Sequence, residues 1–290
     1  MSMLIPKILK SRMRLRKFDI LEDPEDDRKV FFITPPEVYP NLFSLRFPKI
    51  VAKSRRKQWE RTKPGNASFL SFEANVLSED EMEQVKEWSE RFTQYVLIGL
   101  NSNIQSNFSE ELDFCLALDF NFLDGMPGCR TLYGEAEYQL KYKQSISSLD
   151  ILSNGLTKAL YELLEIFHPN SSVLSIVPSP PDQCSVPRKL AQMVHRITDI
   201  PFVDCKLLCD KQGLKGLSLE EKAKEWNRLY SCREGVLLPD DFSGQTVFLI
   251  DDLYQSGTTL WSCAANLKRL GAEKVIGLVC VKTFRDTDNQ

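Results

Sequence analysis

The sequence predicts an α/β protein with a doubly wound, mostly parallel sheet and an N-terminal α+β extension. Apolar runs with the length and β-branched content of buried strands lie at 173–177, 247–250 and 275–281. Helical patterns separate these runs, as they do in βαβ units. Two carboxylates directly follow the run at 247–250, at the strand end where such sheets bind ligands.

Length and composition bound the class of protein. The chain has 290 residues, of which 42% are hydrophobic and 27% are charged, so it can form one large domain or two modest ones. We expect a basic N-terminal extension with a helix over 1–110 and an α/β domain over 111–290. The eight cysteines form no CxxC pair and there are two histidines, which indicates reduced thiols in the cytoplasm. No apolar run reaches the length of a membrane span, so we expect no membrane contact.

Charge is unevenly distributed along the chain. Residues 1–63 contain sixteen Lys or Arg against eight Asp or Glu, whereas the remainder carries a net charge of −11. Such asymmetry is typical of a segment that meets a polyanion or an acidic protein. We therefore hypothesise that residues 1–63 contact nucleic acid or an acidic partner, with a solvated surface as the alternative. Trp59, in the basic stretch at 53–61, would either stack on a base or anchor a core.

The elements of the first half follow from local patterns. An apolar piece at 30–33 predicts a short strand in a region rich in proline and charge. Ser78 and Glu81 have the spacing of a capping box, and apolar residues then recur on one face, which predicts a helix from residue 79 to about residue 100. Strict alternation over 112–122 predicts a half-buried strand, antiparallel or at an edge.

The second half alternates between helices and strands. We expect helices over about 151–167, 188–197, 219–230 and 260–270, and strands at 173–177, 202–208, 247–250 and 275–281. Ser218 and Glu221 form a second capping box, and Gly271 stands where a C-terminal cap belongs.

The segment 247–259, VFLIDDLYQSGTT, carries the most chemistry. Asp251 and Asp252 end the apolar run and precede a small polar turn and a helix. Free amides at a helix start, together with the helix dipole, favour a bound phosphate, while the acids accept hydrogen bonds from hydroxyls. A ribose 5-phosphate carries both groups. The segment therefore predicts a ribose-phosphate site, and an ordinary strand-to-helix turn is the alternative.

At these residues the chain resembles the type I phosphoribosyltransferases. Their signature is an apolar run, two acids, two hydroxyl residues, Gly, any residue and Thr, and the only departure here is Gln255. The resemblance implies a phosphoribosyltransferase-like sheet in which Asp251 and Asp252 are catalytic, hold the ribose hydroxyls of phosphoribosyl pyrophosphate and help to organise Mg²⁺. The residues that it implies for substrate binding are Leu253, Tyr254, Gln255, Ser256, Gly257, Thr258 and Thr259.

Over about residues 130–283 the chain resembles the ComF-like subgroup. Lys141 and Tyr142 match a Lys–Tyr pair that precedes a helix in that subgroup. The proline-rich loop after the strand at 173–177 would meet pyrophosphate, with Pro178 and Ser179 as candidate contacts.

A second loop, at 209–217, corresponds in the resemblance to the flexible loop that closes over the reaction centre. Lys211 and Lys215 are its candidate catalytic residues, since they would neutralise the charge of leaving pyrophosphate. Two solvated lysines are the alternative.

The expected function is that of a phosphoribosyltransferase, a glycosyltransferase that uses phosphoribosyl pyrophosphate or a related nucleotide with Mg²⁺ and an unknown acceptor. One alternative is a nucleotide-sensing module without turnover. Another is an effector subunit of a nucleic-acid-associated complex for DNA uptake or antiviral defence, docked through the basic N-terminal region; this alternative rests on family analogy.

Overall fold

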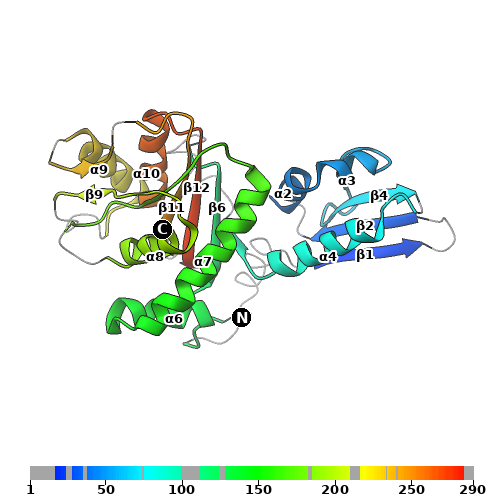
Figure 1. Ribbon diagram of the computed structural model, residues 1–290, viewed down its shortest axis with the longest axis horizontal. Helices are drawn as coiled ribbons and strands as arrows, with labels where there is room; N and C mark the ends of the chain where they lie inside the picture. Colours follow the sequence, from blue (N-terminus) through cyan, green and yellow to red (C-terminus); the bar gives the residue numbers. More distant parts are fainter. Residues whose placement is uncertain are drawn as a thin grey trace. The chain divides into compact units, whose positions relative to one another are not determined.

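The computed structural model is shown as a ribbon in Figure 1. It describes residues 17–23, 28–34, 38–73, 75–98, 111–123, 128–181, 185–209, 216–232, 234–239 and 241–283. The chain divides into two compact units, one of Met1–Gly99 with Glu165–Phe167 and one of Leu100–Leu164 with His168–Gln290.

The first unit contains an antiparallel sheet in the strand order β1-β2-β4-β3. Alternation along the strands separates two faces, because Phe31, Leu70 and Phe72 are at most 1% exposed whereas Phe32 and Phe69 are half-buried. This confirms the predicted α+β extension and its strand at 30–33. The elements are β1 (Lys17–Asp23), β2 (Arg28–Thr34), α2 (Val38–Arg46), α3 (Pro48–Lys53), β3 (Glu60–Arg61), β4 (Ser68–Glu73), α4 (Glu79–Phe92) and β5 (Val96–Leu97).

Aromatic rings pack helices α2 and α4 against one face of this sheet. Trp88 of α4 is fully buried, stacks on Phe92 at a centroid distance of 4.7 Å and meets Phe43 of α2 edge-on at 5.5 Å. Phe43 in turn lies 5.9 Å from Phe18 of β1. Each fully buried ring of this kind contributes about 2 kcal/mol to stability.

The start of α4 is as predicted and its end is not. The Ser78 hydroxyl accepts from the Glu81 amide at 3.2 Å, and the Glu81 carboxylate accepts from the Ser78 amide at 2.8 Å, which confirms the capping box. The helix ends at Phe92, not near residue 100. Val96 and Leu97, which continue the apolar pattern, are instead extended in β5.

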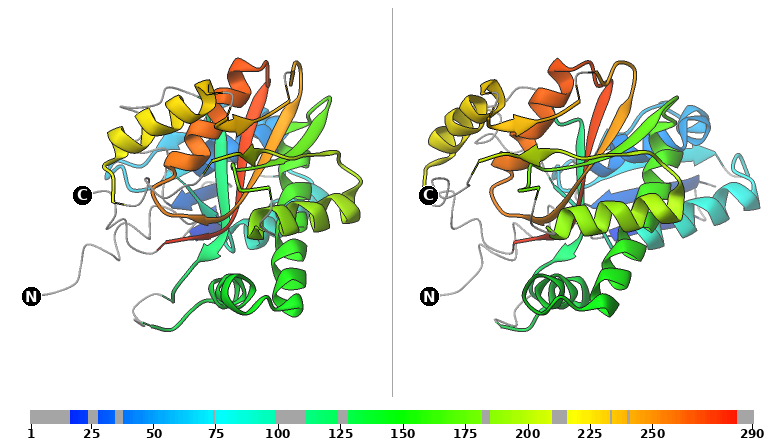
Figure 2. Two further views of the ribbon diagram at one scale, coloured as in Figure 1. Left: turned by 90° about the vertical axis from the view of Figure 1, so that its left-hand side faces the viewer. Right: turned by 60° about the vertical axis from the view of Figure 1, so that its left-hand side comes forward.

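The second unit contains a parallel sheet whose strands lie in the order β6-β12-β11-β7-β8. Helices cover both of its faces, with α9 and α10 on one side and α7 and α8 on the other (Figure 2). The doubly wound α/β fold is thereby confirmed. The elements are β6 (Phe114–Phe120), α6 (Leu132–Lys143), α7 (Ile146–Phe167), β7 (Ser172–Ile176), α8 (Val186–Thr198), β8 (Phe202–Val203), α9 (Leu219–Ser231), β11 (Thr246–Tyr254), α10 (Thr258–Arg269) and β12 (Lys274–Lys282).

Strand β6 corrects two expectations. It pairs in parallel with β12, so the antiparallel alternative for the strand at 112–122 was wrong. Both of its faces are buried: Leu116 and Leu118 are at most 1% exposed, and so are Cys115 and Ala117 on the face expected to be solvated. Small side chains such as Cys and Ala can be buried under helices or exposed to water. Alternation of large and small residues therefore does not show which face of a strand is exposed to solvent.

Two further segments differ from the sequence expectation. The Lys141–Tyr142 pair, expected to precede a helix, lies inside one, helix α6. The Thr131 hydroxyl caps this helix by accepting from the Gly134 amide at 2.9 Å. The single strand expected at 202–208 is split between β8 of the large sheet and β9 (Lys206–Leu207), which pairs with β10 (Val236–Leu237) in a small antiparallel sheet. In the part of the chain that the structure describes, no helix combines the length and the apolar character needed to cross a membrane.

Candidate functional site

The acid pair lies where the strand order reverses. β11 pairs with β7 as far as Ile250–Ile176, and with β12 as far as Tyr254–Lys282. α8 follows β7 and α10 follows β11, and these two helices cover opposite faces of the sheet (Figure 2). In open α/β sheets, ligands bind beyond the carboxyl ends of the strands at such a reversal. Asp251 and Asp252 stand at this position on β11.

Both acids are half-buried and already accept hydrogen bonds. The Asp251 Oδ1 atom accepts from the amide of Asp252 at 2.9 Å, which fixes the first carboxylate against its own strand. The Asp252 Oδ2 atom accepts from the Nζ of Lys141 at 3.0 Å. The pair therefore points a partly neutralised negative charge at the strand end.

Lys141 bridges two carboxylates. Its Nζ lies 3.0 Å from Asp252 and 3.4 Å from Glu137, one turn earlier on α6. Burial lowers the pKa of Lys141, but the Asp252 and Glu137 carboxylates more than offset this and raise it well above the ordinary lysine value. Burial also raises the pKa of Glu137, and Asp252 adds to that rise while Lys141 opposes it. Lys141 thus stays protonated and holds α6 to the acid pair.

The sequence indicates Lys141 only as half of a Lys–Tyr pair. Its neighbour Tyr142 is 67% exposed, and its ring packs on Tyr138 at 4.9 Å. Glu137, which is 5% exposed, was missed. The available signal was the four-residue spacing of Glu137 and Lys141 on one helix face.

The turn after the acids is built around Gly257. Its φ of +79° lies in the left-handed region, and it forms the N-cap of α10. The Ser256 and Thr258 hydroxyls lie 3.0 Å apart, and the Thr258 amide donates to the Ser256 hydroxyl at 3.4 Å. Gln255 is exposed, whereas Leu253, Ser256 and Thr259 are half-buried and Thr258 is 2% exposed. Helix N-terminal amides and the dipole of α10 face this turn, as a phosphate site requires.

The side chain of Tyr254 lies beneath the same turn. It is 4% exposed, and its Oη accepts from the Nε1 of Trp261 on α10 at 3.4 Å. A Cβ at position 257 would lie 2.2 Å from this Oη. Glycine is therefore required at position 257 for two reasons: its φ is positive, and Tyr254 occupies the space that a Cβ would need. The buried Tyr254 ring therefore supports the turn from below, and the Tyr254 carbonyl accepts from the Thr283 amide at 3.0 Å.

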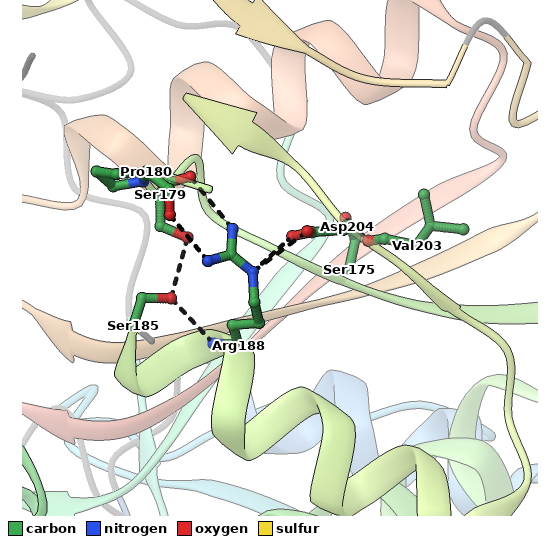
Figure 3. Close-up of polar contacts among 7 residues, drawn as sticks. All are labelled: Ser175, Ser179, Pro180, Ser185, Arg188, Val203 and Asp204. Carbon is green, nitrogen blue, oxygen red and sulfur yellow. Dashed lines mark hydrogen bonds and ion pairs between the residues drawn. The ribbon is translucent and has the colours of Figure 1, made fainter. Parts of the chain in front are cut away.

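Arg188 organises the loop after β7 (Figure 3). Its Nε donates to both carboxylate oxygens of Asp204, at 3.1 and 3.2 Å, and its Nη atoms donate to the carbonyls of Pro180 at 2.9 Å and Ser179 at 3.2 Å. Arg188 is 8% exposed. This guanidinium therefore holds the loop in shape and is occupied by protein acceptors.

Ser179 is also engaged by the protein. Its hydroxyl accepts from the Ser185 hydroxyl at 3.1 Å. Its amide donates to the Cys205 carbonyl at 3.3 Å, and its carbonyl accepts from the Leu207 amide at 2.9 Å. Pro178 and Ser179 follow the carboxyl end of β7, the strand that pairs with β11. Lys211 and Lys215 lie outside the described residues.

The acid pair suits Mg²⁺ that is shared with a substrate. This ion takes one or two carboxylates and completes its octahedron with phosphates and water. Among the described residues, no three His, Cys, Asp or Glu side chains are grouped to hold a metal. Asp251 and Asp252 fit a metal that a phosphorylated ligand brings with it.

No protein-family model matches the sequence, and no curated protein matches it. Solved structures are similar in fold. A purine phosphoribosyltransferase from Pyrococcus horikoshii is 16% identical, with a TM-score of 0.31, over 49% of this chain and 86% of that one.

An adenine phosphoribosyltransferase from Leishmania tarentolae is 13% identical, with a TM-score of 0.36, over 67% of this chain and 98% of that one. Its counterpart from Thermoanaerobacter pseudethanolicus is 17% identical, with a TM-score of 0.28, over 46% and 73%. At these values the likeness to the phosphoribosyltransferases concerns only the fold of part of this chain.

Proposed function

We propose that the chain binds phosphoribosyl pyrophosphate, or a related ribose 5-phosphate nucleotide, with Mg²⁺ and transfers the phosphoribosyl group to or from an acceptor. One observation supports the proposal above all. Asp251 and Asp252 lie near the carboxyl end of β11, just past its last pairing with β7, and the Gly257 turn and the start of α10 follow within a few residues. Hydroxyl acceptors and phosphate donors are therefore adjacent along the chain, as a ribose 5-phosphate needs.

The residues would divide the work by chemistry. Asp251 and Asp252 accept from the ribose 2- and 3-hydroxyls and so orient the sugar. The backbone amides from Gly257 to Thr259 and the hydroxyls of Ser256 and Thr259 donate to the 5-phosphate. Phosphoribosyl transfer develops positive charge on the ribose and negative charge on pyrophosphate, so fixed charges next to each stabilise the transition state.

Bound Mg²⁺ would neutralise pyrophosphate, with Asp251 and Asp252 holding it through the ribose hydroxyls and water. Lys211 and Lys215 are proposed to add charge and to exclude water when their loop closes. Pro178 and Ser179 follow β7, the strand next to β11, and are proposed to contact pyrophosphate. We also propose that the chain belongs to the ComF-like subgroup. The proposal names no acceptor.

Thermal stability tests the binding step. Phosphoribosyl pyrophosphate with Mg²⁺ at about 100 times its Kd stabilises the folded state by about 2.7 kcal/mol, which raises the melting temperature by several degrees. Asp251→Asn/Asp252→Asn should abolish this shift. The matched control is Asp241→Asn/Glu273→Gln, since these exposed acids lie before β11 and β12, at the opposite end of the sheet. An equal shift in both double variants would contradict the proposal.

Release of pyrophosphate across a panel of nucleobases tests turnover. Transfer predicts release that depends on one class of base and is lost in Asp251→Asn/Asp252→Asn. If phosphoribosyl pyrophosphate binds but no pyrophosphate is released with any nucleobase or with water as the acceptor, the sensing module is the function that remains.

The sensing module has a specific observation in its favour. Arg188, a cation near the loop after β7, donates to Asp204 and two carbonyls, and Lys141 is held between Asp252 and Glu137. Cations already bound to protein acceptors give less help to a leaving pyrophosphate. In this alternative the site reports the presence of a nucleotide without consuming it.

A further inference from the structure

The first unit contains a groove of about 470 Å³ on the sheet face opposite the helix layer. Its floor includes Phe32 of β2 and Phe69 of β4, which are register partners on neighbouring strands. Their ring centroids lie 5.9 Å apart and their planes differ by 34°. Both side chains line the groove and are half-buried, so part of each is accessible from it.

The aromatic floor is separate from the core of the unit. Phe31 and Phe72, which belong to the same two strands, point to the other face and are completely buried among the helix rings. Trp59 also belongs to that core, since its ring meets Phe43 at 5.3 Å and its Nε1 donates to the Ser44 hydroxyl at 3.1 Å. This packing favours the alternative in which Trp59 anchors a core.

The groove wall is basic. The chain from Arg55 to Arg61 runs beside β4, where the Arg55 amide donates to the Ser71 carbonyl at 2.9 Å and β3 pairs with Phe69 and Ser68. Arg55, Arg56 and Lys63 line the groove together with one described carboxylate, that of Glu60. The Arg55 Nε lies 2.7 Å from Glu73, while the Arg56 side chain is 72% exposed and its Nε lies 3.9 Å from Glu60.

We propose that this groove binds single-stranded nucleic acid, with unstacked bases on Phe32 and Phe69 and phosphates against Arg56 and Lys63. Aromatic rings on an antiparallel sheet stack on bases of any sequence, and flanking cations follow the backbone. Charge complementarity selects this occupant: the groove combines cations with an aromatic floor, and only a ligand with both phosphates and flat rings uses both. The site belongs to the first unit and is independent of phosphoribosyl transfer.

A duplex does not fit this surface, because its bases are stacked inside the helix and cannot reach rings on the floor of a groove. A polyanion without bases would use the cations alone. These two ligands therefore serve as the competitors in the test.

Fluorescence anisotropy of the full chain with labelled oligothymidylate and oligouridylate of about 12 nucleotides measures the interaction directly. An abasic oligonucleotide of the same length supplies the charge without the rings, and a duplex supplies both with the rings hidden. We expect the single strands to bind at least tenfold more tightly than either competitor. Equal affinity for the abasic strand would overturn the proposal, as would absence of binding at low salt.

Two pairs of variants separate stacking from charge. Phe32→Leu/Phe69→Leu keeps the apolar volume of the floor and should weaken binding about tenfold or more, with little change in salt dependence. Arg56→Gln/Lys63→Gln should reduce the slope of log K against log salt by about 0.7 for each phosphate that these cations neutralise. Lys49→Gln/Lys86→Gln is the charge-matched control, since both lysines are exposed on the helices α3 and α4.

Circular dichroism and the melting temperature show whether each variant folds. A folded Phe32→Leu/Phe69→Leu variant that binds as tightly as the parent would overturn the role of the rings. The control pair should leave the affinity within about twofold of the parent. A loss equal to that of Arg56→Gln/Lys63→Gln would show that binding depends on net charge and not on the groove, which would contradict the proposal.

Discussion

The Nζ of Lys141 on α6 lies 3.0 Å from the carboxylate of Asp252 on β11, a separation of 111 residues in the sequence. The same ammonium lies 3.4 Å from Glu137, so one lysine joins a buried carboxylate to the end of the central strand. In the free protein, Asp252 is thus already neutralised in part. A sugar or metal that approaches Asp252 meets a carboxylate whose position α6 has fixed.

Replacement of Lys141 should make stability more dependent on pH. In Lys141→Gln, Glu137 loses the ammonium that opposes the rise of its pKa, so this pKa rises further. A carboxyl whose pKa is higher in the folded than in the unfolded state contributes stability below its unfolded pKa, and this contribution is lost as the pH rises through the folded pKa. The loss of melting temperature in Lys141→Gln should therefore be small near pH 4 and grow toward about pH 8.

The double variant Glu137→Gln/Lys141→Gln provides the control, because it has no buried carboxyl left to titrate at this position. Its loss of melting temperature relative to the parent should change much less between the same two pH values. A penalty for Lys141→Gln that is the same at every pH would show that Glu137 does not depend on Lys141.

Gly257 should tolerate alanine less well than another glycine with positive φ. Gly244 has a φ of +69° and no atom within 4 Å of an added Cβ, so Gly244→Ala costs about 1 kcal/mol for its backbone conformation alone. At Gly257, with a φ of +79°, the added Cβ would also meet Tyr254 Oη at 2.2 Å. Gly257→Ala should cost roughly a further 1–3 kcal/mol in the free energy of unfolding, as measured with urea. Equal costs would mean that Tyr254 does not fill this space.

Arg188 should couple strongly to Asp204. Both lie close to the loop after β7, with side chains 10% and 25% exposed, and removal of one member of such a pair leaves the other charge poorly solvated. We expect Arg188→Met to lower the free energy of unfolding by about 3 kcal/mol, and a double-mutant cycle with Asp204→Asn to give a coupling above about 1 kcal/mol. Additive losses would contradict the paired geometry of Figure 3.

Sequence patterns predicted the parallel strands well, because strands buried on both faces are continuous apolar runs whatever lies around them. The runs at 173–177, 247–250 and 275–281 correspond to β7, β11 and β12, of which β11 and β12 are longer than their runs. The acid–turn–helix segment was equally local, so the polar turn and the helix after it were predicted, although α10 begins at Thr258 and not near residue 260.

Features that depend on distant partners could not be predicted in this way. The link from Glu137 through Lys141 to Asp252 arises only when α6 is packed near β11, and the role of Arg188 depends on Asp204, sixteen residues away. The groove in the first unit needs the register that pairs Phe32 with Phe69. Each of these results from tertiary packing and not from local propensity.

Glu81 should make the capping of α4 sensitive to acid. Hydrogen bonds from Lys53 and from the Ser78 amide lower the pKa of Glu81 below its usual range. A carboxyl whose pKa is depressed on folding contributes stability above its unfolded pKa of about 4.3 and loses it as the pH falls. Hydrogen exchange in α4 should therefore be faster in Glu81→Gln than in the parent at neutral pH and equal near pH 3. Exchange that differs equally at both pH values would contradict this assignment.

Calorimetric titration with Mg²⁺ and phosphoribosyl pyrophosphate is the sharpest test of the ribose-phosphate site, because it measures binding without requiring the acceptor. We expect one site in the parent chain, unchanged affinity in Asp241→Asn/Glu273→Gln, and a loss of at least tenfold in Asp251→Asn/Asp252→Asn, equal to about 1.4 kcal/mol or more. Absence of binding to the folded parent, or equal affinity in the two double variants, would show that the acids of β11 do not hold a ribose phosphate.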